Sequence, residues 1–388
     1  MWIQRDFQSY FKKIRALPIK ILKGPRQVGK TSILQKMGGY KVIYFDDLLV
    51  RRAAQENPRL FFDQFDEPLV LDEATLAPEI FPELKRRVDQ QRRHQNLPQL
   101  DVWITGSNQT LLQKNVRESL SGRASYFDLN TLSLHELGDI PLISFLLRGG
   151  WPQLHIDADL DPTRYLNDLI FTFIEKDIVA AAGIERREAF GKSLNLVAGR
   201  VGQLLNSSDI SKLVGVDTTT VQSWISILEQ NGLLRKVQPY YSNLNQRLIK
   251  TPKIYFEDVG LASRLQGWSD SLPLMASSQY GHLVENIAYS EISKFFSNRG
   301  SPAKIFFVRS KEKVEVDFLI ELPNNLFVAV EVKVTPVDWE PKQHQIIDSL
   351  GIDVSHRWVL TPSKKTVFAT AKVVEFGELW SELDKLWR

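Results

Sequence analysis

Hydrophobic residues in the first 130 positions alternate between short continuous runs and longer segments with helical spacing. A short apolar run bounded by turn residues is typical of a buried strand, whereas a spacing of three to four residues is typical of a helix. The expected strands are residues 19–23, 41–45, 69–71, 102–105 and 126–129. Helical segments between successive strands predict an α/β fold with a parallel sheet covered on both faces.

The hydrophobic spacing changes between residues 190 and 262, where three helical segments precede two short strands with a polar tip. This order predicts a helix-turn-helix unit with a wing. Its second helix, in "DTTTVQSWISILEQNGLL", would expose Thr218, Thr219, Gln222 and Ser223. The residues that could contact DNA phosphates are Arg247, Lys250 and Lys253. A purely structural or inter-subunit role for this unit is the alternative, because its basic residues are few.

The stretch "GPRQVGKTS" follows the first expected strand and begins a helix, which is the setting of a phosphate-binding P-loop. The predicted nucleotide contacts are Gly24, Pro25, Arg26, Gln27, Val28, Gly29, Lys30, Thr31 and Ser32. Lys30 would neutralise the β- and γ-phosphates of ATP, and the Thr31 hydroxyl would ligate Mg²⁺.

Two further strands end in polar residues at the edge where ligands bind in open α/β sheets. In "PLVLDEA", Asp72 would hold Mg²⁺ through water and Glu73 would polarise the attacking water. In "DVWITGSN", Ser107 is the residue expected to sense the γ-phosphate. Arg123, more than Arg117, could act as an arginine finger on a neighbouring subunit, and a surface salt bridge is the alternative.

The last hundred residues combine acidic side chains with alternating strand patterns. In "KEKVEVDFLIE" and "LFVAVEVKVT", alternation places Asp317, Glu331 and Lys333 on one side of two adjacent strands, and Glu285 lies on a preceding helix. Asp317 and Glu331 could bind Mg²⁺ while Lys333 orients water, which is an arrangement for phosphodiester hydrolysis. The alternative is a half-buried sheet edge with solvated charges.

These motifs carry two resemblances. The series "GPRQVGKTS", "LDEATLAPEIFPELKRRVD", "WITGSNQTLL", "SLSGRA", "LSLHELG", "LLRGGWPQ" and "FIEKDI" resembles a prokaryotic AAA-type ATPase family whose C-terminal domain has no known function. That resemblance implies ATP, Mg²⁺ and ring-like or face-to-face homo-oligomers, although Lys176 stands where relatives usually have arginine. The acidic set resembles the PD-(D/E)XK nuclease superfamily, with Val316 in place of its proline. Degenerate members of that superfamily only bind nucleic acid.

Length and composition narrow the function classes. A chain of 388 residues is expected to form several domains: an ATPase core at 1–138, a helical lid at 139–189, a winged helix at 190–268 and a nuclease-like domain at 269–388. With no cysteine, the chain has no disulfide or thiol nucleophile, which fits the cytoplasm. The amphipathic N-terminus is no signal peptide, and no apolar run is long enough to span a membrane.

Three functions fit these observations. The first is an ATP-driven motor that binds and remodels DNA, as in branched-DNA handling during recombination or repair. The second is an ATP-gated, Mg²⁺-dependent DNA endonuclease in defence. The third is a nucleotide switch that scaffolds protein partners without DNA. The acidic set and the basic hairpin favour the two DNA functions, and the motor is the prediction.

Overall fold

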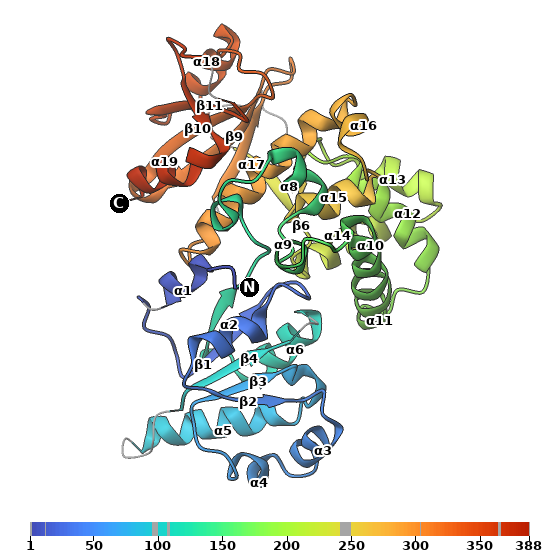
Figure 1. Ribbon diagram of the computed structural model, residues 1–388, viewed down its shortest axis with the longest axis vertical. Coiled ribbons are helices and arrows are strands. Elements are labelled where there is room, and N and C mark those ends of the chain that lie inside the picture. The colour runs from blue at the N-terminus through green and yellow to red at the C-terminus, as the bar shows by residue number, and fades with distance from the viewer. Residues whose placement is uncertain are drawn as a thin grey trace.

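The structure is a computed structural model that describes residues 2–11, 13–94, 100–106, 109–240, 250–302, 304–363 and 366–387, apart from the side chains of 113 and 175–177. Figure 1 shows one sheet at the bottom, a second sheet at the upper left and a group of helices at the right. The long helix α17 (Gln279–Ser297) passes between the second sheet and the helices.

The N-terminal sheet is entirely parallel, in the order β2-β3-β4-β1-β5. Its strands are β1 (Ile19–Lys23), β2 (Lys41–Tyr44), β3 (Leu69–Asp72), β4 (Val102–Thr105) and β5 (Ala124–Asp128). All residues of β4 are buried, and in β1 and β3 only the last is partly exposed, because helices cover both faces. The predicted parallel α/β sheet is therefore confirmed, with strand bounds that differ by two residues at most.

The helices of this first unit connect the strands and precede the sheet. They are α1 (Asp6–Phe11), α2 (Lys30–Met37), α3 (Leu48–Glu56), α4 (Pro58–Phe62), the short 3₁₀ helix η1 (Ala74–Leu76), α5 (Ile80–Arg93), α6 (Gln109–Ser119) and α7 (Leu134–Leu137). Phe7 of α1 packs edge-on against Trp103 of β4 and Phe127 of β5. This contact anchors the N-terminal segment on the sheet, beside the start of the P-loop.

The middle of the chain is helical. Its elements are α8 (Leu142–Arg148), α9 (Gln153–Ile156), α10 (Pro162–Leu169), the π-helical η2 (Ile170–Ile178), α11 (Val179–Ala181), α12 (Arg187–Ala198), α13 (Ser207–Val214), α14 (Thr218–Gln230), α15 (Val259–Leu265) and α16 (Ser271–Met275). In α14 the apolar residues Val221, Trp224, Ile225 and Leu228 are buried, and the helix ends before Asn231 as its sequence predicts.

The predicted hairpin consists of β6 (Leu234–Pro239) and β7 (Lys253–Phe256), which pair antiparallel. The remaining strands are β8 (Ile305–Arg309), β9 (Glu315–Leu322), β10 (Leu326–Val332), β11 (His356–Thr361) and β12 (Lys372–Glu375). The short 3₁₀ helices η3 (Pro323–Asn325) and η4 (Phe376–Glu378) and the helices α18 (Pro341–Asp348) and α19 (Leu379–Leu386) complete this region. Through two parallel pairs between β6 and β8, all seven strands form one sheet in the order β12-β11-β10-β9-β8-β6-β7.

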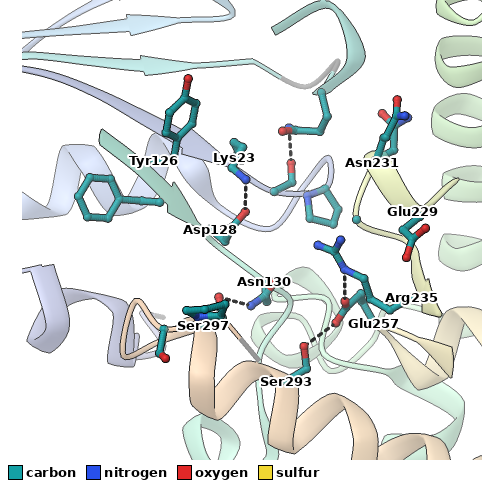
Figure 2. Close-up of a pocket in the computed structure, with 18 of the residues that line it drawn as sticks. Lys23, Tyr126, Asp128, Asn130, Glu229, Asn231, Arg235, Glu257, Ser293 and Ser297 are labelled. Atoms are coloured by element: carbon teal, nitrogen blue, oxygen red, sulfur yellow. Dashed lines mark hydrogen bonds and ion pairs between the residues drawn. The ribbon is translucent and has the colours of Figure 1, made fainter. Parts of the chain in front are cut away.

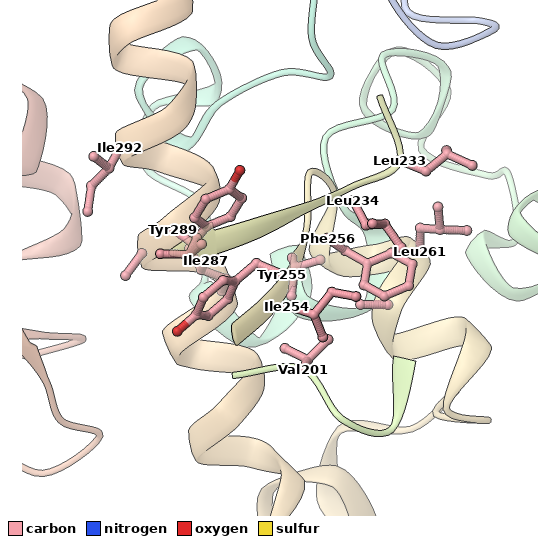
Figure 3. Close-up of a cluster of buried hydrophobic side chains, with 14 of the residues drawn as sticks. Val201, Leu233, Leu234, Ile254, Tyr255, Phe256, Leu261, Ile287, Tyr289 and Ile292 are labelled. Atoms are coloured by element: carbon pink, nitrogen blue, oxygen red, sulfur yellow. The ribbon is translucent and has the colours of Figure 1, made fainter. Parts of the chain in front are cut away.

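Helix α17 covers the outer edge of the hairpin. The Asn286 side chain pairs with both backbone groups of Phe256, accepting from its N–H at 2.7 Å and donating to its carbonyl at 3.0 Å. Tyr255 stacks on Tyr289 with ring centroids 4.9 Å apart. Figure 3 labels both side chains within the hydrophobic cluster beside α17. These contacts satisfy an edge strand that would otherwise expose unpaired backbone groups. The hairpin is therefore joined to the C-terminal region by strand pairing and by core packing.

One hydrophobic cluster extends from the face of the first sheet that α1 and α2 cover through the helical middle to α17. A second cluster lies on the other face of the first sheet, and a third lies beneath α18. Because the shared cluster contains residues from all four predicted domains, their motions are expected to be coupled. In the described part of the chain, no helix combines the length and apolar character needed to cross a bilayer.

Candidate functional site

The P-loop bends tightly between β1 and α2. Gly24 has φ 146°, and a Cβ at this position would lie 2.1 Å from the Leu129 carbonyl oxygen. Gly29 has φ 89° and forms the N-cap of α2, a conformation that side chains rarely adopt. Both glycines are therefore required by the backbone. The helix begins at Lys30, so the last backbone N–H groups of the loop point toward a common phosphate position.

Lys30 lies within the loop and is buried. Its Nζ donates to the carbonyl oxygens of Gly24 at 3.0 Å and Pro25 at 2.8 Å. Burial lowers the pKa of Lys30 to about 8, against the opposing effect of the Glu73 and Asp72 charges. An amine that is desolvated in this way gains most from an anionic ligand, which restores its charge.

Asp72 and Thr31, the residues predicted to hold Mg²⁺, lie side by side. Thr31 Oγ1 donates to Asp72 Oδ1 at 2.7 Å, and Thr105 Oγ1 donates to the same oxygen at 2.6 Å. The hydroxyl and carboxylate come from the loop and from β3, two strands away from β1 in the sheet. Hard oxygen ligands beside a phosphate-binding loop fit Mg²⁺, so the residues present match the predicted role.

Glu73 follows Asp72 in an unusual backbone conformation. Its φ is 54° and its ψ is 41°, in the left-handed region, and its N–H donates to Thr105 Oγ1 at 3.3 Å. A non-glycine residue in this region stores strain, and such strain concentrates at functional sites. The Glu73 side chain also lines the P-loop cavity, where a catalytic glutamate is required.

The P-loop borders a cavity of about 600 Å³. Its other walls come from the N-terminal segment and the lid, namely Trp2, Ile3, Arg5, Pro152, Ile156 and Tyr165. Arg5 is buried and donates to the Val28 carbonyl at 3.0 Å, while Tyr165 of α10 donates to Gln27 Oε1 at 2.6 Å. The cavity thus has a polar floor of loop amides and an apolar wall that suits a nucleotide base.

The C-terminal acidic residues are brought together from three elements. Glu285 lies on α17, Asp317 on β9 and Glu331 on β10, and each is buried. Asp317 Oδ2 accepts from the Val332 N–H at 2.8 Å, and Lys333 Nζ donates to Glu331 Oε1 at 2.7 Å. Burial raises the pKa of Asp317 well above its usual value, with further contributions from the Glu331 and Glu285 charges.

A residue from the hairpin also enters this acidic cluster. Lys253 of β7 is 1% exposed, and its Nζ lies 2.9 Å from Glu285 Oε1, 2.5 Å from Glu315 Oε1 and 3.9 Å from Asp317 Oδ1. The prediction that Lys253 contacts DNA phosphates is wrong in this structure, because the side chain points inward to these carboxylates. Within the described residues, no group of three or more acidic or histidine side chains is arranged to hold a metal ion.

At Glu285 the Lys253 charge and several hydrogen bonds together outweigh the effect of burial. Burial acts to raise the pKa of Glu285, but the Lys253 charge and hydrogen bonds from His282, Tyr255 and Lys253 lower it to about 2. Burial likewise acts to lower the pKa of Lys253, but Glu285, Asp317 and Glu315 together raise it. The cluster is therefore a buried, mutually neutralising ion-pair network.

Comparison with known families divides the chain into three parts. Residues 17–138 match the model of an AAA domain, residues 141–272 match a domain of unknown function (DUF8612) and residues 280–379 match another (DUF4143). The first match covers the P-loop, Asp72 and Glu73. The chain contains an AAA-type ATPase domain.

Several uncharacterized proteins are similar to this chain over most of its length. An uncharacterized protein of Mycobacterium tuberculosis and one of Mycobacterium bovis are each 26% identical over 324 residues, covering 82% of this chain and 71% of the relative. An uncharacterized protein of Haemophilus influenzae is 24% identical over 382 residues, covering 89% of each chain.

Two solved structures are similar at a lower level. The Walker-type ATPase PABY2304 of Pyrococcus abyssi aligns with a TM-score of 0.41 at 15% identity, covering 68% of this chain and 94% of that chain. Cdc6p from Pyrobaculum aerophilum aligns with a TM-score of 0.28 at 14% identity, covering 57% of this chain and 81% of that chain.

The accessory residues predicted for the ATPase domain are Arg123, Arg117 and Ser107. Arg123 donates through Nε and one Nη to both Asp89 carboxylate oxygens, at 2.7 and 3.0 Å, so it forms the salt bridge that was the alternative to a finger. Arg117 is exposed. Ser107 and Arg247 lie outside the described residues, as does the Lys176 side chain.

A larger cleft of about 760 Å³ separates the ATPase domain from α14, β6 and α17. Figure 2 shows that its charged side chains form pairs, among them Lys23 with Asp128 at 2.9 Å and Arg235 with Glu257 at 3.1 Å. Lys236 likewise pairs with Glu229. The cations that line this cleft are paired with carboxylates, so it does not have the character of a second phosphate site. The cleft is an interface between the ATPase domain and the later elements of the chain.

Three residues near the nucleotide cavity belong to no sequence motif, and only the tertiary structure shows that they lie there. Gln109 is buried and donates to the Gly24 carbonyl at 2.9 Å, which links the start of α6 to the P-loop. Arg5 and Trp2 reach the cavity from the N-terminal segment. The apolar residues around Phe7 could have indicated that this segment packs on the sheet, but not where its side chains lie.

Proposed function

We propose that this protein is an oligomeric, ATP-hydrolysing motor that binds and remodels DNA in the cytoplasm. The observation that carries the proposal is the hydrogen-bonded contact between the ATPase domain and the end of α14. Asn231, at the end of α14, donates to Thr110 Oγ1 at 3.3 Å, and the preceding Gln109 holds the P-loop. A change in the loop is thereby connected to the helix expected to meet DNA.

The chemical roles follow from the geometry of the P-loop cavity. The loop N–H groups and Lys30 would bind the phosphates, and Thr31 and Asp72 would hold Mg²⁺, which would neutralise developing charge. Glu73, held beside the cavity by its strained backbone, accepts a hydrogen bond from the attacking water. Gln109 fixes the first carbonyl of the loop and so orients the phosphate-binding amides.

The exposed face of α14 supports a DNA role. Thr219, Gln222 and Ser223 are exposed there, while Thr218 is half-buried and shares a hydrogen bond with Ser211. Uncharged side chains of this kind contact sugar and phosphate oxygens or base edges. Lys250, at the start of the segment that enters β7, is also exposed and contributes positive charge nearby.

Exposed apolar residues support self-association of the ATPase domain. Leu48 and Leu49 of α3 and Leu60 of α4 are 53%, 76% and 58% exposed, and they lie beside the β2 edge of the sheet. Exposed apolar residues that gather in this way mark interaction surfaces. A ring would place this surface against a neighbouring subunit.

The test is the ATPase rate with Mg²⁺ at fixed salt, with and without branched, duplex and single-stranded DNA, and with the same reactions analysed for cleavage. Stimulation without cutting is expected of the motor, and Asp317→Ala should retain it. Mg²⁺-dependent nicking that Asp317→Ala and Lys333→Ala abolish would instead establish the endonuclease. An ATPase rate that no DNA changes would favour a nucleotide switch with protein partners.

A further inference from the structure

The acidic cluster of the C-terminal region already contains a cation. Lys253 projects from β7, and the carboxylates around it come from α17 and β9. Its Nζ is within 3 Å of oxygens of both Glu285 and Glu315, and Asp317 lies slightly farther away. The Phe307 ring, with its centroid 5.5 Å from Nζ, closes another side. The ammonium group is thus enclosed by three carboxylates and an aromatic face.

The surrounding backbone leaves little space beside this lysine. Gly202 approaches so closely that a Cβ there would lie 3.0 Å from Glu285 Oε2. Its N–H donates to the Ile254 carbonyl at 2.9 Å, which holds the loop after α12 against β7. The Tyr255 hydroxyl donates to the same Glu285 oxygen as Lys253. Glu285 Oε1, an oxygen that a metal would need, therefore already accepts two hydrogen bonds from the protein.

Charge balance leads to the same conclusion. Glu285 is paired with Lys253, Glu315 with both Lys253 and Arg309, and Glu331 with Lys333. Mg²⁺ requires several oxygen ligands in near-octahedral geometry and keeps some of its waters. A protonated amine between the carboxylates repels a divalent ion and takes up its ligands. The residues present therefore do not fit the metal that the nuclease resemblance implies.

We propose that the Lys253 side chain is the resident cation of this site, in the place of a divalent metal, and that it locks the hairpin onto the C-terminal region. A metal ion can enter only when β7 withdraws or when Lys253 is replaced. The buried Glu331 Oε2, which has no hydrogen-bond partner among the described residues, is the oxygen available to a metal in that case. This inference does not rest on the motor function, since a DNA-independent ATPase could contain the same lock.

The test is a Mn²⁺ titration of the nucleotide-free full chain, followed by thermal unfolding. Asp72→Asn serves as the background, so that the ATP site contributes no response. Lys253→Met in that background should gain a saturable rise in melting temperature of roughly 2–6 °C, which added Asp317→Asn removes. In the background chain, where Lys253 is intact, adding Asp317→Asn should leave the response of the melting temperature to Mn²⁺ unchanged. Lys20→Met, which removes another buried lysine paired with a carboxylate, is the matched control and should gain no response.

Two results would overturn the proposal. One is a Mn²⁺-dependent stabilisation of the chain with Lys253 intact that Asp317→Asn removes, because the metal would then bind beside the lysine. The other is a folded Lys253→Met chain that gains no response. If Lys253→Met does not fold, Lys253→Gln, which can still donate to Glu285, takes its place. The comparison of the background with and without Asp317→Asn decides the question even if neither lysine variant folds.

Discussion

The Asn231 side-chain amide donates to Thr110 Oγ1 and so joins the end of α14 to the start of α6. Thr110 follows Gln109, whose amide holds the first carbonyl of the P-loop. This short series of contacts is a physical connection between the nucleotide cavity and the helix proposed to meet DNA. It suggests that the two sites influence each other by a path that can be tested at single residues.

Asn231→Ala should separate DNA stimulation from basal hydrolysis. We expect the basal ATPase rate to stay within about twofold, whereas stimulation by DNA falls several-fold because the contact with Thr110 is lost. The measurement is the ratio of rates with and without saturating DNA. Gln230→Ala, at an exposed neighbouring position, is the control and should keep the full ratio. Equal stimulation in both variants would show that coupling takes another route.

Glu73→Gln should abolish turnover while retaining nucleotide binding. The amide keeps the shape of the side chain but cannot accept a proton from water, so kcat is expected to fall by ~100-fold or more. Steady-state hydrolysis and equilibrium binding of ATP would be measured on the same preparation. Glu79→Gln, an exposed glutamate six residues later, should be unaffected in both. Retained hydrolysis in Glu73→Gln would remove Glu73 from the mechanism.

Nucleotide affinity should depend on the ionisation of Lys30. Because burial lowers its pKa to about 8, a growing fraction of Lys30 is neutral as the pH rises above that value. A bound triphosphate restores the charge, so affinity should be highest below pH 8, and binding should take up a proton above it. Calorimetry in buffers of different ionisation enthalpy detects that proton. Lys30→Arg remains charged throughout and should show no such uptake.

Trp2→Ala should weaken ATP binding without affecting the phosphate-binding residues. Trp2 lines the apolar wall of the P-loop cavity, and its Nε1 is buried without a hydrogen-bond partner among the described residues. Loss of an aromatic surface that stacks on a base costs about 1–3 kcal/mol. That cost corresponds to a roughly 5- to 150-fold rise in Kd, measured with a fluorescent ATP analogue. Trp2→Phe should recover most of the affinity, and an unchanged Kd in Trp2→Ala would place the base elsewhere.

Glu291 should make stability depend on pH. Burial raises its pKa from 4.5 to about 7, although Lys294 and the Leu134 N–H oppose the shift and Glu136 adds to it. The folded state thus keeps a proton that the unfolded state loses, and the free energy of unfolding falls as the pH rises from about 4.5 to about 7.

Glu291→Gln removes that ionisation while keeping an acceptor for the Leu134 N–H. At pH 8 it should therefore exceed the wild type in stability by up to about 3 kcal/mol, and the two should converge near pH 4. Denaturant unfolding across this pH range measures the difference. The exposed Glu118→Gln variant should follow the wild type. A wild-type stability that rises over this window would contradict the assignment.

The sequence by itself determined the nucleotide-binding part of this protein. The central strands β1, β3 and β4 of the first sheet are buried on both faces, so their continuous apolar runs are visible without any structure. Gly24 and Gly29 are required by local backbone geometry, and Lys30, Thr31, Asp72 and Glu73 follow from their places at the ends of strands. The helices and hairpin of the middle region were predictable for the same reason, since helix caps and spacing act over a few residues.

Only the tertiary structure decided the partners of long side chains. Lys253 looks like a surface residue beside a polar tip, yet it is buried against Glu285, which is 32 residues away along the chain. The same holds for Arg5 on the P-loop and for Arg123, which pairs with Asp89 instead of remaining exposed. Local patterns fix which face of an element is apolar, but they do not contain the positions of charges on other elements. Those positions follow from how helices and strands pack, and that packing sets the character of the C-terminal site.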